Sequence, residues 1–135
     1  MPNALYDKGR EGFLDGSIDW DTDNIKTILV DAADYVVDLA THQFLSDIIA
    51  GARVATSANM TGKTVTAGVA DADDVTFSAV VGDPSEALVI VQDTGVEATS
   101  RLIAYIDTAS GLPVTPNGGD IQTQWDAGAN KIFKL

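Results

Sequence analysis

The chain contains no cysteine, which excludes a disulfide framework, thiolate zinc sites and a cysteine nucleophile. It has a single histidine, His42, so the several imidazoles of a histidine zinc site are missing too. The chain has only 8 basic residues and 20 acidic ones, which gives a net charge of −12. Because such a charge repels phosphate backbones, we expect no nucleic-acid partner. No apolar run approaches the ~20 residues of a membrane-spanning helix, and the N-terminal residues do not read as a secretory signal. We therefore expect no membrane partner.

Common catalytic motifs are incomplete. The segment SANMTGKT ends like a phosphate-binding loop, but Ser57 stands where the pattern requires a glycine. No G-x-S-x-G elbow is present to supply a serine nucleophile for His42, for which we expect a structural role. We therefore predict that the chain is not an enzyme and binds no cofactor.

Acidic residues are abundant, and one stretch resembles the start of a calcium loop. SIDWDTDNIK, residues 17–26, has an aspartate at every second position: Asp19, Asp21 and Asp23. An EF-hand needs glycine and glutamate where this stretch has Asn24 and Val30. A looser calcium site remains an alternative, since an extended segment would place the three carboxylates on one face. We favour a solvated strand edge without a metal, whose opposite face is buried: Ile18, Trp20 and Thr22.

Short apolar segments with period-two alternation indicate a mainly β protein. A buried strand is predicted at 25–30, and two central strands at 86–93 and 101–107 are predicted to be joined by a hairpin loop. A second hairpin is predicted from 64–69 and 74–80, with the acidic stretch between them as its turn. A further strand is expected near 120–126, and 111–119 is irregular. This pattern predicts one antiparallel β-sandwich or barrel-like domain over 17–135.

Two helical segments are also predicted. Residues 1–16 read as a short helix that Asn3 caps and Gly16 ends. Gly9 and Gly12 each weaken that helix by ~1 kcal/mol relative to alanine, so we expect an arm that needs a surface to lie on. One further helical turn is predicted at 41–49, with Thr41 as its cap and three inward side chains: Phe44, Leu45 and Ile48.

Several blocks in order cover most of the chain: NALYDKGREGFLDGSIDW, LATHQFLSDI, GARVATS, ADDVTFSAVVGDPSEALVIVQDTG, TSRLIAYIDTASGLPVTPNGGDI and WDAGANKIFKL. As a whole they resemble a family of small virion structural proteins of tailed bacteriophages. The resemblance implies a capsid decoration, or cement, protein that is made in the host cytoplasm and sits on the outer capsid shell of the virion. The implied partners are the major capsid protein and other copies of the chain, as a homotrimer.

Candidate interface residues come from the N-terminal arm, the scarce arginines and the 111–119 loop: Leu5, Tyr6, Arg10, Phe13, Arg53, Arg101, Pro113 and Pro116. Each arginine has an intramolecular salt bridge as its alternative role. Two other functions stay open. One is a tail or neck component, including a host-binding module, and the other is a calcium-dependent carbohydrate-binding β-sandwich.

Overall fold

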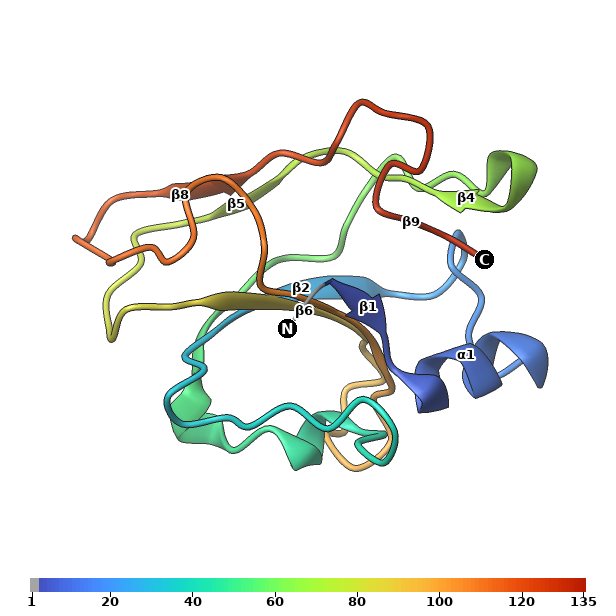
Figure 1. Ribbon diagram of the computed structural model, residues 1–135, viewed down its shortest axis with the longest axis horizontal. Helices are drawn as coiled ribbons and strands as arrows, with labels where there is room; N and C mark the ends of the chain where they lie inside the picture. Colours follow the sequence, from blue (N-terminus) through green and yellow to red (C-terminus); the bar gives the residue numbers. More distant parts are fainter. Residues whose placement is uncertain (1–2) are drawn as a thin grey trace.

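A five-stranded antiparallel sheet runs through the middle of the molecule in the order β1-β7-β6-β2-β3 (Figure 1). The computed structural model describes residues 3–135. The strands of this sheet are β1 (Ala4–Leu5), β2 (Ile25–Val30), β3 (Arg53–Thr56), β6 (Ala87–Gln92) and β7 (Leu102–Ile106). The predicted strand at 25–30 and the predicted central hairpin of β6 and β7 are confirmed, and every residue of β6 is buried.

Two small antiparallel pairs form a second layer over one face of this sheet (Figure 1). One joins β4 (Val69–Ala70) to β9 (Phe133–Lys134), and the other joins β5 (Val75–Phe77) to β8 (Ile121–Thr123). The apolar core between the layers includes Ile25, Leu29, Phe77, Leu88 and Ile90. The predicted fold class is thus confirmed: the chain is mainly β, with a sandwich-like arrangement of antiparallel sheets and one α-helix.

The opposite face of the large sheet is covered by the segment between β2 and β3 (Figure 1). This segment contains two short 3₁₀ helices, η1 (Leu45–Asp47) and η2 (Ala50–Ala52). The second apolar core beneath it includes Ile28, Val30, Ile48, Val89 and Val91. Because β2 and β6 contribute alternate side chains to two cores, both strands are apolar on both faces.

The predicted hairpin of 64–69 and 74–80 is wrong. The chain turns at η3 (Thr66–Gly68), where Ala67 and Gly68 have φ values of 56° and 75°. Val65, just before this turn, is 51% exposed. The strands that follow this turn pair with distant segments, because β4 joins β9 and β5 joins β8.

The predicted N-terminal cap of the first helix is wrong as well. The helix α1 (Asp7–Leu14) begins after Tyr6, whereas Asn3 accepts hydrogen bonds from the backbone of Asp107 and Thr108 with its amide oxygen, each at 3.0 Å. Gly16, with φ of 82°, follows the end of the helix as expected.

Thr41 caps no helical turn. Its hydroxyl donates to the carboxylate of Asp38 at 2.7 Å, and η1 begins later, at Leu45. Of the three side chains predicted to face inward, Ile48 is fully buried and the other two are half-buried: Phe44 and Leu45.

The N-terminal segment is part of the domain rather than a separate arm. Its strand β1 completes one edge of the five-stranded sheet by pairing with β7. Gly9 and Gly12 are buried, and both allow close packing: Gly9 against the backbone of β7 and Gly12 against the side chain of Ile18. The division into 1–16 and 17–135 is therefore corrected for residues 3–16, because glycine lets the helix lie directly on the sheet.

Candidate functional site

An apolar groove of about 280 Å³ opens between α1, the turn that follows it and the β4–β9 pair. We call it the aromatic groove. Its walls include Phe13, Trp20, Val65, Val69, Phe133 and Leu135. Three separate parts of the chain therefore meet here, and among residues 3–135 the only charged side chain in the lining is that of Asp19.

The rings in the groove support one another. Phe133 lies between Phe13, at a centroid distance of 5.8 Å, and Trp20, at 5.3 Å with the two planes nearly perpendicular. The indole nitrogen of Trp20 donates a hydrogen bond to the carbonyl oxygen of Asp71 at 3.1 Å, which fixes the ring. Such tilted and edge-on pairs are a favoured arrangement of aromatic side chains. The groove is therefore a preformed surface.

The apolar surface continues beyond the rings. Val65 and Leu135 line the groove and are 51% and 60% exposed. Leu14, the neighbour of Phe13 at the end of α1, is 88% exposed. Exposed apolar side chains at the border of a groove, such as Val65 and Leu135, mark contact sites in soluble proteins.

Sequence reasoning placed only one predicted interface residue in the groove, Phe13, which is half-buried there. Leu5 and Tyr6 are 7% and 0% exposed, with side chains in the chain's own cores, so neither side chain is available as a surface contact. The other residues of the groove were missed, because nothing in the sequence places 65–70 beside 133–135. The exposure of Val65 could indicate the groove only once the turn at η3 is known.

The two prolines lie elsewhere. Pro113 is exposed and Pro116 half-buried, in a loop held by backbone hydrogen bonds between Ser85 and Val114 at 2.8 and 2.9 Å. This loop leads into β8, at the far end of the molecule from β9 (Figure 1). The structure therefore does not bring the loop together with the groove.

Each predicted interface arginine has a partner within the chain. Arg10 pairs with Asp7 at 3.0 Å, and Arg53 pairs with Glu97 at 2.6 Å. The guanidinium of Arg101 lies over the ring of Phe44, 5.6 Å from its centroid. The intramolecular alternative is therefore found for Arg10 and Arg53, and Arg101 makes a cation–π contact.

The 19–23 aspartates lie in a turn and not along an extended strand. The backbone N–H of Asp23 donates to the carbonyl of Asp19 at 2.9 Å, and the Asp23 carboxylate accepts from Gln92 at 2.6 Å. A hydrogen bond between the carboxyl groups of Asp19 and Asp21 lowers the pKa of Asp19 and raises that of Asp21. The predicted alternation holds for two buried residues, Ile18 and Trp20, and fails at Thr22, which is exposed.

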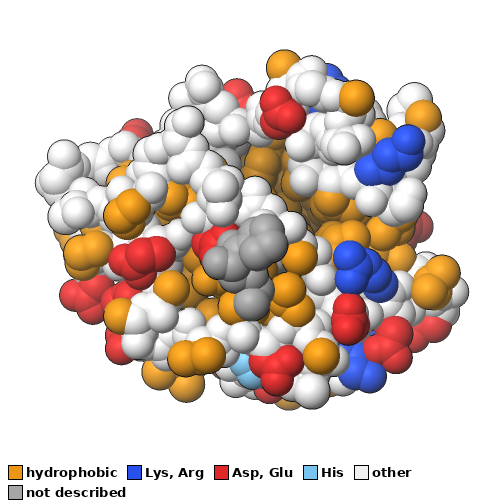
Figure 2. All heavy atoms as spheres, in the orientation of Figure 1, with side chains coloured by type: hydrophobic (Ala, Val, Ile, Leu, Met, Phe, Trp, Pro, Cys, Tyr) orange, Lys and Arg blue, Asp and Glu red, His pale blue; other side chains and the backbone are white. Residues whose placement is uncertain are grey.

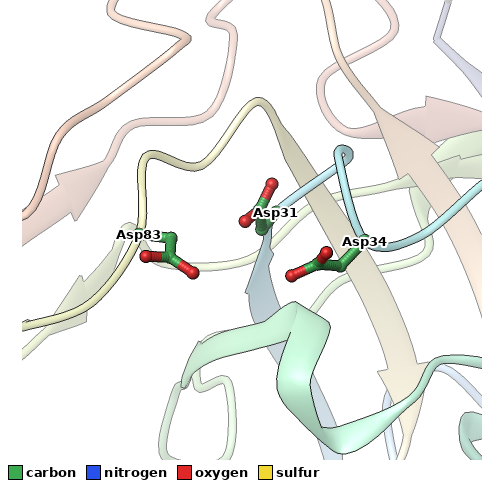
Figure 3. A group of neighbouring side chains, drawn as sticks. All are labelled: Asp31, Asp34 and Asp83. Carbon is green, nitrogen blue, oxygen red and sulfur yellow. The ribbon is translucent and has the colours of Figure 1, made fainter.

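A different group of carboxylates meets at the end of β2 (Figure 3). Asp31 and Asp34 come from the end of β2 and the turn after it, and Asp83 comes from the loop before β6. One oxygen of each lies within 4.8 Å of the others. Carboxylate oxygens are ligands that Ca²⁺ prefers, so these three residues could hold a divalent cation. The sequence gives no sign that Asp83 joins the other two.

His42 belongs to a polar network beneath the sheet. The hydroxyls of Tyr6 and Tyr35 lie 2.9 Å apart, and the Tyr35 hydroxyl lies 2.8 Å from His42 Nδ1. The backbone N–H of Asp38 also donates to this nitrogen at 3.2 Å. Burial raises the pKa of Tyr6 above its usual value and that of Tyr35 to about 12. These contacts support a structural role for His42.

Comparison with known proteins gives no matching family model and no curated protein with significant similarity. Within residues 3–135, no helix is both long enough and apolar enough to cross a lipid bilayer. The proposal that follows therefore depends on the groove and on the sequence blocks described above.

Proposed function

We propose that this chain is a structural protein of a tailed-phage virion that decorates the outer capsid shell and binds neighbouring capsid subunits. The observation that carries the proposal is the aromatic groove with its exposed apolar border. The resemblance of the sequence blocks to small phage virion proteins supports the same role. The proposed partners are the major capsid protein and other copies of the chain, arranged as a homotrimer.

The charge of the molecule makes the groove selective. A net charge of −12 opposes non-specific association between copies of the chain, because like-charged surfaces repel. Binding must then come from a local apolar contact, and aromatic anchors in a preformed pocket supply most of the energy in such interfaces. A capsid surface that offers an apolar side chain to Phe133 and Trp20 satisfies this requirement.

The test uses particles of the encoding phage from which this chain has been removed. Purified chain is added, and bound chain is measured by co-sedimentation. We expect Val65→Asp to weaken binding at least tenfold, because a charge in the groove must be desolvated on docking. The matched control is Val96→Asp, since Val96 is 56% exposed in the loop between β6 and β7. Equal binding by the two variants would remove the groove from the interface.

The position in the virion is a separate question with its own experiment. Antibody against the chain, imaged on intact particles, is expected to label the capsid shell. Label confined to the tail or neck would replace capsid decoration with the alternative of a tail component or host-binding module.

A further inference from the structure

A second hollow, of about 450 Å³, separates the edge strand β1 from the C-terminal strand β9. We call it the β1–β9 seam. Residues of its lining include Leu5, Arg10, Ile106, Asn130, Ile132 and Lys134. Figure 2 shows hydrophobic side chains in the hollow on this face, with basic side chains above and below. It shares only Phe133 with the aromatic groove.

One wall of the seam offers an unpaired backbone N–H. Tyr6 donates its N–H to the carbonyl of Ile103 at 3.0 Å, and Leu5 lies opposite Ala104 in the same pairing. Because backbone groups alternate in direction along an antiparallel strand, the N–H and C=O of Leu5 point away from β7. Arg10 donates a hydrogen bond to that carbonyl at 3.5 Å, whereas the Leu5 N–H has no hydrogen-bond partner within residues 3–135.

The other wall is built in the same way. Leu135 donates its N–H to Gly68 at 3.0 Å, and β9 pairs with β4 through Phe133 and Lys134. By the same alternation, the backbone groups of Lys134 point away from β4. The two walls thus resemble the edges of a sheet that lacks a strand between them.

The charge of the seam is opposite to that of the molecule. The chain has 20 acidic and 8 basic residues, yet the described part of the chain lines the seam with two cations, Arg10 and Lys134, and with no carboxylate side chain. Arg10 also pairs with Asp7, whereas Lys134 makes no ion pair within the described residues. A ligand for this surface is therefore expected to be acidic.

We propose that the β1–β9 seam binds an extended, acidic peptide segment of another protein, which adds as a β-strand to an exposed sheet edge. Strand addition uses the free backbone groups for affinity and alternate side chains for specificity. Since successive side chains of a strand point to opposite sides, the segment places apolar residues against Ile106 and Ile132 and acidic residues near Arg10 and Lys134. The inference goes beyond the proposed function and does not depend on the aromatic groove.

The test uses purified full-length chain and two synthetic peptides with blocked ends, (Asp-Val)₄ and (Lys-Val)₄. Affinity is measured by calorimetry at low salt. We expect (Asp-Val)₄ to bind at least tenfold more tightly than (Lys-Val)₄. We also expect the bound peptide to slow hydrogen exchange of the Leu5 amide at least tenfold, measured by NMR.

The decisive comparison is between two variants that each replace one lysine by glutamate, inside and outside the seam. Lys134→Glu should weaken (Asp-Val)₄ binding at least fivefold, whereas Lys8→Glu, with the same charge change on α1 outside the seam, should leave it within twofold. Circular dichroism confirms that both variants are folded. Equal effects of the two variants, unchanged exchange at Leu5, or tighter binding of heparin than of (Asp-Val)₄ would each overturn the inference. The peptide experiment contains no phage particles. A failure of the peptide to bind would therefore not contradict capsid decoration, and binding of the peptide would not establish it.

Discussion

Gly9 lies where the helix α1 meets the backbone of β7. A Cβ atom added at Gly9 would lie 2.7 Å from the carbonyl oxygen of Leu102 and 3.0 Å from that of Ile103. Both obstacles are backbone atoms of a central strand, which cannot move aside as a flexible side chain can. The residue that weakens the helix in isolation is therefore the one that lets it pack on the sheet.

We predict that Gly9→Ala lowers the free energy of unfolding by about 1–3 kcal/mol, although alanine favours the helix by ~1 kcal/mol. Urea unfolding followed by circular dichroism measures the change. The control is Gly51→Ala, because nothing lies within 4 Å of a Cβ at that position. A Gly9→Ala protein at least as stable as the wild type would show that α1 is not pressed against β7.

The tyrosines give a second prediction at this scale. The chain has three, and burial is the largest cause that raises the pKa of each: Tyr6, Tyr35 and Tyr105. A free tyrosine is half-ionised near pH 10. At pH 10 we therefore expect the folded chain to show clearly less tyrosinate absorbance at 295 nm than the same chain unfolded in urea, where about half of each tyrosine is ionised.

The raised tyrosine pKa values also determine how the free energy of unfolding changes with pH. The unfolded chain ionises its tyrosines near pH 10, while the folded chain holds Tyr35 neutral to about pH 12. The stabilising contribution is thus complete below pH 10 and is lost as the pH rises through the folded value. Normal tyrosinate absorbance at pH 10 in a folded sample would contradict the buried network.

Among the elements, the 3₁₀ helices η1 and η2 depend on one side chain from β3. The Arg53 guanidinium donates to the carbonyl of Ile48 at 2.7 and 2.9 Å and forms the ion pair with Glu97. Ile48 is fully buried, so Arg53 joins the covering segment to the strand at a point from which water is largely excluded.

We predict that Arg53→Ala lowers the free energy of unfolding by about 2–3 kcal/mol, since it leaves a buried carbonyl without its donors. Glu97→Gln, which removes only the exposed side of the ion pair, should cost clearly less, because solvent screens an exposed carboxylate. Chemical unfolding of both variants provides the comparison. Equal losses would place the stabilising effect in the ion pair instead of the carbonyl contacts.

The elements also show what the sequence can and cannot predict. Strands β2, β6 and β7 are apolar on both faces, so their own residues identify them as central. The strands of the second layer have two or three residues each, and their partners lie far away in the chain. Local alternation therefore suggested a hairpin at 64–80 that long-range pairing replaces. The aromatic groove was missed for the same reason, because it exists only once β4 and β9 have paired.

At the scale of the whole molecule, the net charge of −12 opposes folding through self-repulsion. We predict that the melting temperature rises by a few degrees when NaCl increases from about 10 to about 300 mM, because the screening length falls from ~30 Å to below 10 Å. Differential scanning calorimetry measures it. A melting temperature that falls with salt would mean that attractive ion pairs outweigh the repulsion.

Calcium provides the control for that experiment. If screening is the whole effect, CaCl₂ should give the same melting temperature as NaCl at the same ionic strength. A further rise that Asp83→Asn abolishes would place a cation among the three carboxylates at the end of β2, and would favour the calcium-dependent alternative.

The pairing of β1 with β7 also bears on how the chain folds. Asn3 and Thr108, 105 residues apart, are hydrogen-bonded beside this pairing. A nascent chain cannot complete its large sheet until β7 has left the ribosome, and β9, which is made later, then closes the second layer. Such non-local topologies fold in milliseconds to seconds rather than microseconds. The strand β1 is thus made before its partner β7 and waits for it.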